Sequence, residues 1–431
     1  MSTLFLLIYN CIRLPLFLIV WIAGCFNAKI RAALRGRRNV FDHLASKLSD
    51  IPSDAQRIWI HISSLGEYEQ GLPLIDELLE RFPDKWIIIS LFSPSAFDHI
   101  KHQKDRTILT YLPFDSYRAS VKFLILIRPA IHVIIRHDIW PNYQYILCKH
   151  QIPSLLVDAS VSDRRLKMIR KPAWIYRQVY DTFTALCVIS DKHKERHFSI
   201  YSHPERIYVC GDTRYDRVYQ RAMDTKKITD LGLAESFDHQ YTLVVGSSWP
   251  ADEERYLEAV TKGIHMFPSF KCIIAPHELD SEHIAELEHH FFDHNITVQR
   301  LTQLKPNNPV EARILICDRM GLLANLYALG FLAYVGGGFG VGVHSVLEPA
   351  AHGALVCFGP RYLNSPEAAQ MVKLNLSRSI QTIEEFESFL YSALSHPEAT
   401  QVQRKRTEEF VLRNVGAAAR TADIIGKYML T

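Results

Sequence analysis

The feature that most constrains the fold is a repeated alternation of short β-rich runs with helical runs. The β-rich runs contain mostly Ile and Val, with little polar alternation, which is typical of strands buried on both faces of a parallel sheet. Helical patterns such as Leu72–Arg81 separate them. This alternation indicates a doubly wound α/β domain. The expected strands of the first series are Ile58–Ile62, Trp86–Leu91, Ile131–Ile135, Ser154–Val157 and Ala185–Ile189.

A second series follows a charged stretch at 221–239 that has few core residues. A chain of 431 residues suits two domains plus additions. We predict two Rossmann-like halves, 41–220 and 221–431, with the ligand in a cleft between them, outside the carboxyl ends of the strands. The tail, 403–430, has a helical pattern that could pack back on the first half. The expected strands of the second series are Thr242–Gly246, Lys271–Ala275, Ile314–Cys317, Phe331–Val335 and Ala354–Phe358.

The amino-terminal segment, 1–40, predicts a membrane anchor. Leu4–Phe26 is almost continuously apolar, and ~20 apolar residues suffice to cross a bilayer. Arg13 interrupts the run and would have to snorkel or lie in the interface. The basic residues that follow favour anionic headgroups and a cytoplasmic body. They are Lys29, Arg31, Arg35, Arg37 and Arg38.

Two other interpretations of this segment remain open. Ile22-Ala23-Gly24-Cys25 is similar to a lipoprotein cleavage box, which would leave a lipidated Cys25 and place the body outside the cytoplasm. The apolar run is also compatible with a buried core helix. A cleaved signal peptide would require a basic start, which Met1-Ser2-Thr3 does not provide.

Charge and cysteine usage exclude some classes of function. The net charge of +3 is too small to argue for a nucleic-acid partner. The eight cysteines show neither a C-x-x-C pair nor a Cys/His metal spacing, and we expect buried, reduced thiols. No metal ion and no cofactor are expected.

Three turns that follow strands in the first half contain candidate catalytic residues. Glu67 follows the first strand at a glycine turn and is expected to face the cleft; the alternative is a first-turn helix glutamate. Asp138 would sit beside Glu67 if their strands are near neighbours; the alternative is a helix N-cap. Arg214, within Gly211–Asp216, could clamp a phosphate or carboxylate; the alternative is an interdomain salt bridge.

The second half offers two glycine-containing corners. Gly246-Ser247-Ser248-Trp249 ends a strand, and the glycine-rich turn 336–342 ends another. Glycines in such places let backbone N–H groups approach a phosphate. Glu348, one helical turn beyond His344, could accept hydrogen bonds from ribose hydroxyls. The spacing fits neither the G-x-G-x-x-G nor the Walker pattern.

Together these corners resemble the 3-deoxy-D-manno-octulosonic acid (Kdo) transferase family along nearly the whole chain. In the first half, the S-x-G-E, E-x-W-P-N and G-D-T-R-F-D motifs are matched by Ser64–Glu67, Asp138–Asn142 and Gly211–Asp216. In the second half, G-S-T, A-P-H, M-G-E-L and G-G-x-N-x-x-E-P are matched, some in part, by Gly246–Ser248, Ala275–His277, Met320–Leu323 and Val343–Pro349.

The resemblance implies a GT-B type fold and inverting transfer of Kdo from CMP-Kdo to a lipid A precursor, in lipopolysaccharide synthesis at the cytoplasmic face of the inner membrane of a Gram-negative cell. Glu67 is then the general base, and Asp138 and Arg214 support the transition state. The residues implied in binding CMP are Ser247, Ser248, Pro276, His277, Met320, Gly321, Leu322, Ser345, Val346, Leu347 and Glu348.

The chain departs from the family pattern at four positions. Asp138 and Arg136 stand where glutamates are usual, Leu322 replaces the glutamate of M-G-E, and Ser345 replaces an asparagine. Two alternative functions therefore stay open. One is a GT-B transferase or epimerase for another nucleotide sugar, and the other is a non-catalytic membrane scaffold of the same fold.

Overall fold

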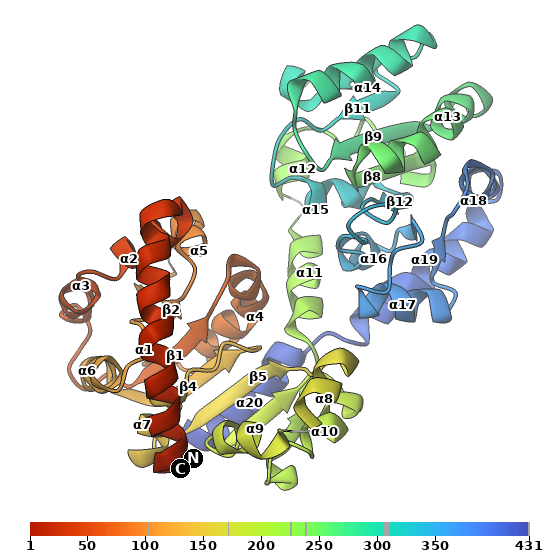
Figure 1. Ribbon diagram of the computed structural model, residues 1–431. Coiled ribbons are helices and arrows are strands. Elements are labelled where there is room, and N and C mark those ends of the chain that lie inside the picture. Colours follow the sequence, from red (N-terminus) through yellow and green to blue (C-terminus); the bar gives the residue numbers. More distant parts are fainter. Residues whose placement is uncertain (101–103, 171, 225, 238, 305–309, 430–431) are drawn as a thin grey trace. The chain divides into compact units, whose positions relative to one another are not determined.

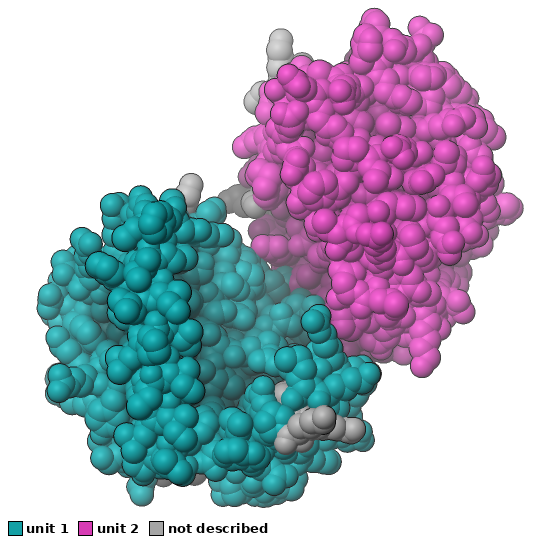
Figure 2. Space-filling model, in the orientation of Figure 1, with its two compact units in different colours: residues 1–217, 415–431 teal, residues 218–414 magenta. Residues whose placement is uncertain are grey.

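The computed structural model describes residues 1–431 except 101–103, 171, 225, 238, 305–309 and 430–431. The chain divides into two compact units (Figure 2). Unit 1 comprises residues 1–217 and 415–431, and unit 2 comprises residues 218–414.

Unit 1 is built on a seven-stranded sheet with the order β3-β2-β1-β4-β5-β6-β7 (Figure 1). Every recorded pairing between its described strands is parallel. All five strands predicted from the first series form, and the structure adds the edge strands β3 and β7. The strands are β1 (Arg57–Ile62), β2 (Trp86–Leu91), β3 (Thr107–Tyr111), β4 (Pro129–Ile135), β5 (Ser154–Ala159), β6 (Ala185–Val188) and β7 (Ile207–Val209).

Helices cover both faces of this sheet. Ile58 and Ile60 of β1 pack in the cluster that includes side chains of α4 and α20. Trp59, between them, points to the opposite face and packs with α3, α6 and α7. The helices of unit 1 are α1 (Thr3–Phe26), α2 (Ala28–Gly36), α3 (Val40–Leu48), α4 (Leu65–Arg81), α5 (Pro94–His99), α6 (Tyr117–Ile127), α7 (Pro141–Lys149), α8 (Asp163–Arg170), α9 (Ala173–Tyr180), α10 (Asp191–His197), η1 (Pro204–Arg206) and α20 (Ala417–Met429), while α11 (Thr213–Met223) crosses the division.

Unit 2 repeats the plan with the order β10-β11-β9-β8-β12-β13-β14, again with parallel pairings throughout the described strands. Its strands are β8 (Thr242–Ser248), β9 (Lys271–Pro276), β10 (Val298–Arg300), β11 (Ile314–Ile316), β12 (Leu332–Val335), β13 (Leu355–Phe358) and β14 (Ser377–Ser379). Its helices are α12 (Lys226–Asp230), η2 (His239–Tyr241), α13 (Pro250–Met266), α14 (Ser281–Asp293), η3 (Leu301–Gln303), α15 (Leu323–Leu326), η4 (Tyr327–Leu329), α16 (Leu347–Ala351), α17 (Pro366–Lys373), α18 (Ile383–Ser395) and α19 (Pro397–Leu412).

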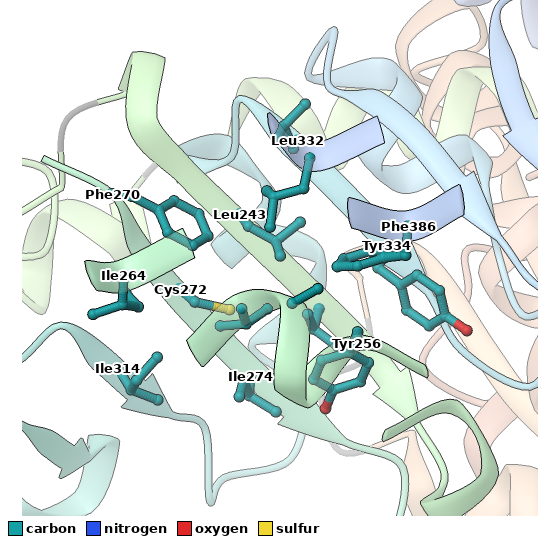
Figure 3. Packing of buried hydrophobic residues seen from close by; sticks show 14 of the residues in the cluster. Leu243, Tyr256, Ile264, Phe270, Cys272, Ile274, Ile314, Leu332, Tyr334 and Phe386 are labelled. Carbon is teal, nitrogen blue, oxygen red and sulfur yellow. The ribbon is translucent and has the colours of Figure 1, made fainter. Parts of the chain in front are cut away.

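The larger core cluster of unit 2 joins the central strands to α13 and α18. Leu243, Cys272 and Leu332 meet Tyr256 and Phe386 in this cluster (Figure 3). Each of these side chains is fully buried. Burial of one such side chain contributes roughly 1.5–3 kcal/mol, so this cluster fixes the helices on that face of the sheet.

Two expectations about the chain need correction. The stretch 221–239 is not core-poor, because Ile228, Leu233 and Phe237 are buried in a cluster with Val244 of β8. The tail is not one helix: α19 ends at Leu412 and α20 begins at Ala417, because Gly416 adopts φ +95° and breaks the run. Helix α20 is part of unit 1.

The cysteine prediction holds only in part. Five cysteines are buried, but Cys11, Cys25 and Cys148 are exposed because they lie on helix faces that point away from the core.

Helix α1 lies against unit 1 through its polar side chains (Figure 1). Tyr9 Oη donates to Asp115 Oδ2 at 2.8 Å, and the side chains of Asn10 and Asn142 bond to each other at 2.9 Å. Phe17 packs edge-on against Phe114 with ring centroids 5.0 Å apart. The opposite side of α1 presents exposed apolar residues, among them Leu7, Ile12, Leu14, Leu18 and Trp21.

Candidate functional site

The strand order of each unit reverses beside its first strand. In unit 1, β1 lies between β2 and β4; in unit 2, β8 lies between β9 and β12. Open α/β sheets bind ligands outside the carboxyl ends of their strands at such a switch point. Glu67 follows β1 and Asp138 follows β4, whereas Ser248 ends β8 and Glu348 follows β12. The candidate residues of each unit therefore gather at its switch point.

Glu67 occupies the first turn of α4. Ser64 is the N-cap, and its hydroxyl accepts from the backbone N–H of Glu67. The Glu67 carboxylate returns to Ser63, accepting from its N–H at 2.8 Å and its hydroxyl at 2.6 Å through the same oxygen, Oε2. This variant of the capping box fixes the carboxylate beside the carboxyl end of β1. The side chain stays partly exposed.

Asp138 is held by a residue that the sequence analysis did not single out. Its Oδ2 lies 2.9 Å from Nε2 of His61, the penultimate residue of β1. Because β1 and β4 are neighbours, the expected proximity of Asp138 to the strand end that carries Glu67 is realised through His61. Asp138 is not a helix N-cap, a position that Trp140 occupies in α7.

The two ring nitrogens of His61 face different partners. Nε2 lies against the Asp138 carboxyl group. Nδ1 lies 2.9 Å from the hydroxyl and 3.2 Å from the carbonyl oxygen of Ser90, and the same hydroxyl accepts from Nε1 of Trp59 at 2.7 Å. This chain runs from the core to Asp138, and His61 is 1% exposed, so the carboxylate is fixed by a rigid, buried side chain.

A pair of buried carboxylates lies on the other side of the switch point. Asp158, near the end of β5, is 2% exposed and adopts φ +52°. It accepts from the N–H and hydroxyl of Thr213 and from the side-chain amide of Gln70. Gln70 also donates to Asp212 Oδ1 at 3.4 Å. Burial and the neighbouring charge of Asp212 raise the pKa of Asp158 to about 7, against the opposing effect of Thr213 and Arg136.

This pKa predicts a dependence of stability on pH. The folded chain retains a proton on Asp158 between its ordinary pKa of 3.8 and about 7, whereas the unfolded chain has released it. The folded state thus binds more protons in this window, so the contribution of Asp158 to the unfolding free energy falls as pH rises and becomes constant above it. Asp158→Asn should flatten this slope in urea unfolding measured from pH 5 to 8. The exposed control Asp50→Asn should keep it, and an unchanged slope in Asp158→Asn would contradict the assignment.

The charged side chains of the motif Gly211–Asp216 bind other groups within unit 1. Nε and Nη2 of Arg214 bind the Asp212 carboxylate at 3.0 and 2.6 Å. Asp216 accepts from the N–H groups of Gly416 and Ala417 and so caps α20. Both residues of the Arg214–Asp212 pair belong to unit 1, so this pair is not an interdomain salt bridge. Asp212 binds the Nε/Nη2 edge, one of the two edges through which a guanidinium can bind a ligand in a bidentate way.

In unit 2, the corner after β8 is tightly built. Ser247 adopts φ +54°, and Ser248 is buried with its hydroxyl donating to Glu253 Oε1 at 3.1 Å. Asp252, which the sequence analysis missed, accepts from the N–H groups of Trp249 and Gly337. It therefore joins the start of α13 to the loop after β12.

Three aromatic rings stack at this corner. His277, which follows Pro276 at the end of β9, has its ring centroid 4.4 Å from that of Trp249 and 4.5 Å from that of His344. Nε1 of Trp249 donates to Nε2 of His344 at 3.2 Å. Burial, with His277 adding to it, lowers the pKa of His344. A neutral His344 is the form that can accept the Trp249 hydrogen bond.

The glycine-rich turn 336–342 uses most of its N–H groups internally. The N–H groups of Gly336, Gly337, Gly340 and Gly342 all donate to acceptors in the protein. A Cβ on Gly336 would lie 2.1 Å from the carbonyl oxygen of Ser247. These glycines are therefore needed for close backbone packing, and the turn is not an open row of donors for phosphate.

The remaining predicted residues divide into exposed and buried ones. Met320 is 81% exposed and Gly321 adopts φ +81° before Leu322, the N-cap of α15. Ser345 is exposed, while Val346 and Leu347 are buried at the start of the short helix α16. Glu348, 19% exposed, pairs with Nη1 of Arg221 at 3.2 Å.

Sequence comparisons identify relatives of the chain. Residues 36–217 match a family model described as 3-deoxy-D-manno-octulosonic-acid transferase (kdotransferase). The chain is 26% identical over 305 residues to a 3-deoxy-D-manno-octulosonic acid transferase of Aquifex aeolicus, covering 70% of this chain and 76% of that one. It is 24% identical over 352 residues to a bifunctional glycosyltransferase/methyltransferase of Fusobacterium nucleatum, covering 80% of this chain but about half, 53%, of that protein.

Structural comparison supports the fold. A UDP-GlcNAc 2-epimerase from Neisseria meningitidis, solved with UDP-GlcNAc bound, superimposes with a TM-score of 0.59 at 12% identity, covering 87% of this chain and all of that one. With its two parallel seven-stranded sheets, the chain has the GT-B type of α/β fold.

Proposed function

This chain belongs to the Kdo transferase family of glycosyltransferases, and we propose that it transfers Kdo from CMP-Kdo to a lipid A precursor with inversion at the anomeric carbon. The observation that carries the proposal is the pair of carboxylates at the switch point of unit 1. Glu67 and Asp138 are tied to neighbouring residues at the carboxyl end of β1, Ser63 and His61.

The proposed reaction is a single displacement. The carboxylate of Glu67 takes the proton from an acceptor hydroxyl, whose oxygen forms a bond to the anomeric carbon of Kdo. The bond from that carbon to the phosphate oxygen breaks, and its electron pair leaves with CMP. General base catalysis of this kind contributes typically 10²–10⁴-fold. Asp138, oriented by His61, would position the acceptor or stabilise the positive charge that develops on the sugar.

In this scheme Arg214 would not bind the phosphate of CMP directly through the edge that Asp212 occupies. Its guanidinium is paired with Asp212, so it would contribute positive potential to the departing CMP unless Asp212 releases it. In unit 2, the Trp249–His277–His344 stack and Glu348 are proposed to contact the donor, because they follow strands that flank its switch point. The proposed reaction uses only these protein side chains and requires neither a metal ion nor a cofactor.

The stereochemistry of the product tests the single displacement. Attack on the face opposite CMP predicts that the new glycosidic bond has the anomeric configuration opposite to that of the donor. Nuclear magnetic resonance of the purified product measures this configuration. Retention would indicate a two-step reaction and remove Glu67 from the role of base.

We further propose that the protein lies on the cytoplasmic face of the inner membrane through α1, without crossing the membrane. The helix is long and apolar enough to span a bilayer by composition. Its inner side, however, supplies Tyr9 and Asn10 to Asp115 and Asn142 of the body. A spanning helix would strip Asp115, which is buried, of its Tyr9 donor. An apolar outer face beside a basic segment suits an interfacial helix.

This geometry changes the design of an anchoring test. Deleting residues 1–40 would also remove Arg37, which is buried and donates to the carbonyls of Phe92 and Leu112, so the body would be destabilised. Replacing the outer residues Leu7, Leu14 and Trp21 by glutamine should instead release a folded protein into the soluble fraction. The control Met266→Gln/Phe292→Gln, at exposed positions of unit 2, should stay with the membrane. Sedimentation of cell extracts measures the difference, and a triple variant that still sediments with membranes would contradict the interfacial assignment.

A further inference from the structure

Arg136 is a charged residue that the proposed reaction leaves without a role. It follows β4 directly and precedes Asp138 by two residues, and its backbone N–H donates to the carbonyl of Val157 on β5 at 2.9 Å. The side chain is only partly exposed, and its Nε is enclosed with no hydrogen-bond partner among the described residues. No carboxylate in the described part of the chain forms an ion pair with this guanidinium. Because enclosed polar groups are nearly always hydrogen-bonded, an anionic ligand is a suitable acceptor for it.

The backbone of this turn does not favour an arginine. Arg136 adopts φ +70°, in the left-handed region that glycine and asparagine tolerate best. The neighbouring strand end offers a carboxylate, Asp158, but its oxygens accept from Thr213 and Gln70. Burial and Asp212 raise the pKa of Asp158, and the charge of Arg136 opposes them without an ion pair. Neither the turn nor Asp158 therefore accounts for a guanidinium at this position.

Other groups beside Arg136 also suit an anion. Nε2 of His137 lies 3.5 Å from the hydroxyl of Ser160, which follows β5. Burial lowers the pKa of His137 to about 4, and the positive charges of Arg165 and Arg136 contribute to this shift. A neutral imidazole and a hydroxyl can each donate one hydrogen bond. The carboxyl ends of β4 and β5 thus combine positive charge with neutral donors.

The position of Arg136 relates it to the proposed base. The strand register pairs His61 of β1 with Ile134 of β4. Ser63 and Arg136, each two residues farther along, therefore leave the sheet at the same level, on strands that lie about 5 Å apart. Ser63 is the residue that holds the Glu67 carboxylate. A ligand group bound to Arg136 would therefore lie beside the atoms that react at Glu67.

We propose that Arg136 binds the carboxylate of a Kdo residue. This inference rests on the proposed function and names the part of the sugar that unit 1 recognises. A guanidinium and a carboxylate form two parallel hydrogen bonds, which fix the orientation of both groups. In a 2-keto sugar acid such as Kdo, the carboxylate is bonded directly to the anomeric carbon, where the reaction occurs. The glutamate that is usual at this position of the family pattern would repel a carboxylate, so the contact is specific to a chain with Arg136.

Two ligands could present this carboxylate. One is CMP-Kdo, and the other is a lipid acceptor that already carries a Kdo residue. Calorimetry with the full-length chain in detergent micelles measures the binding of each ligand in the absence of the second substrate. CMP-Kdo is compared with CMP. The Kdo-bearing lipid is compared with the same lipid without Kdo and with its carboxyl methyl ester.

The variant Arg136→Gln removes the charge and keeps a side chain that can form hydrogen bonds. Arg128→Gln is the matched control, because Arg128 is exposed, also has a positive φ, +44°, and precedes the same strand at its opposite end. Thermal melting verifies that each variant is folded. If Arg136→Gln fails to fold, Arg136→Asn takes its place, because asparagine tolerates the left-handed backbone.

The expected result is at least about ten-fold weaker binding by Arg136→Gln of the ligand that presents the carboxylate. Binding of CMP, of the methyl ester and of the lipid without Kdo should change less than about two-fold, and the control should bind every ligand as the wild type does. A loss confined to CMP-Kdo would assign the carboxylate to the donor. A loss confined to the Kdo-bearing lipid would assign it to the acceptor, and losses for both would mean that Arg136 binds it in each complex.

Four results would overturn the inference. Unchanged affinity of Arg136→Gln for both Kdo ligands would remove Arg136 from the site. Equal losses for the ligands with and without a free carboxylate would mean that the carboxylate is not recognised. Equal losses in Arg128→Gln would mean a general effect of surface charge, and a wild type that binds neither Kdo ligand would leave no carboxylate to recognise. Because binding is measured without turnover, a wild type that shows the carboxylate-dependent difference but transfers no Kdo would contradict the proposed reaction alone.

Discussion

Replacing Glu67 by glutamine is expected to lower kcat by ~10²–10⁴ with little change in the KM for CMP-Kdo. Glutamine has the same shape, and its carbonyl oxygen can still accept the two hydrogen bonds from Ser63. It cannot take a proton at neutral pH. The substitution therefore separates the chemical role of the carboxylate from its role in ending β1 and starting α4. Steady-state kinetics with saturating donor measures the loss.

The competing explanation is structural and predicts a different observable. A first-turn glutamate contributes ~0.3–1 kcal/mol to stability through the helix dipole, so its loss would lower the melting temperature and leave kcat nearly intact. Glu80→Gln, at an exposed position on the same helix, controls for the loss of one negative charge on α4. A folded Glu67→Gln protein with near-wild-type kcat would remove Glu67 from the chemistry.

Replacing Glu348 by alanine is expected to raise the KM for CMP-Kdo roughly ten- to a hundred-fold while kcat changes little. A carboxylate that accepts from ribose hydroxyls would stabilise bound substrate and transition state alike, and its charge-assisted hydrogen bond would contribute ~1.5–3 kcal/mol. Glu348 lies at the start of α16, in the loop region after β12. Calorimetry with CMP alone measures the same effect without catalysis.

The ion pair with Arg221 makes a second variant necessary. If Glu348 serves only to hold Arg221, then Arg221→Ala and Glu348→Ala should lower the melting temperature equally and leave CMP affinity unchanged. If Glu348 binds the donor, the two variants should differ in CMP affinity. Glu384→Ala, exposed on α18, is the control for a lost negative charge in unit 2. Unchanged CMP affinity in Glu348→Ala would remove Glu348 from the donor site.

The sequence predicted the central strands of both sheets and missed the outer ones. Strands β1 and β8 contain the apolar runs Ile58–Ile60 and Leu243–Val245, which are buried because both faces of each sheet are covered. The edge strands β10 and β14 are only three residues long, and Ser377–Ser379 contains no apolar residue. Such strands form because a neighbouring strand offers its backbone, which composition does not reveal.

The sequence predicted which strand ends contain the candidate site residues, but it did not predict the hydrogen bonds between those residues. The motifs located Glu67 and Asp138, yet their proximity depended on β1 and β4 being neighbours, which only the sheet order establishes. The one available signal for His61 was a polar residue inside an apolar strand. The sequence contained no comparable signal for Asp158, because its hydrogen-bond partners Gln70 and Thr213 are distant in sequence.

The amino-terminal helix shows a similar limit. When the apolar segment is assessed from sequence as a membrane helix, its polar residues weaken the assignment. In the structure, Asn10 is the residue that binds Asn142, and Arg13 donates to Asn10. The interruptions are thus contacts between α1 and the body of unit 1, and the sequence of the helix alone does not reveal them.

The measurement that tests the central claim most directly is mass spectrometry of the lipid product. Detergent-extracted protein is incubated with CMP-Kdo and a tetra-acylated lipid A precursor, with parallel incubations of Glu67→Gln and of wild type supplied with UDP-GlcNAc in place of CMP-Kdo. The account predicts release of CMP and a lipid that has gained one or more Kdo residues, strongly reduced in Glu67→Gln. An unmodified lipid with CMP-Kdo, or conversion of UDP-GlcNAc to an epimer, would contradict it.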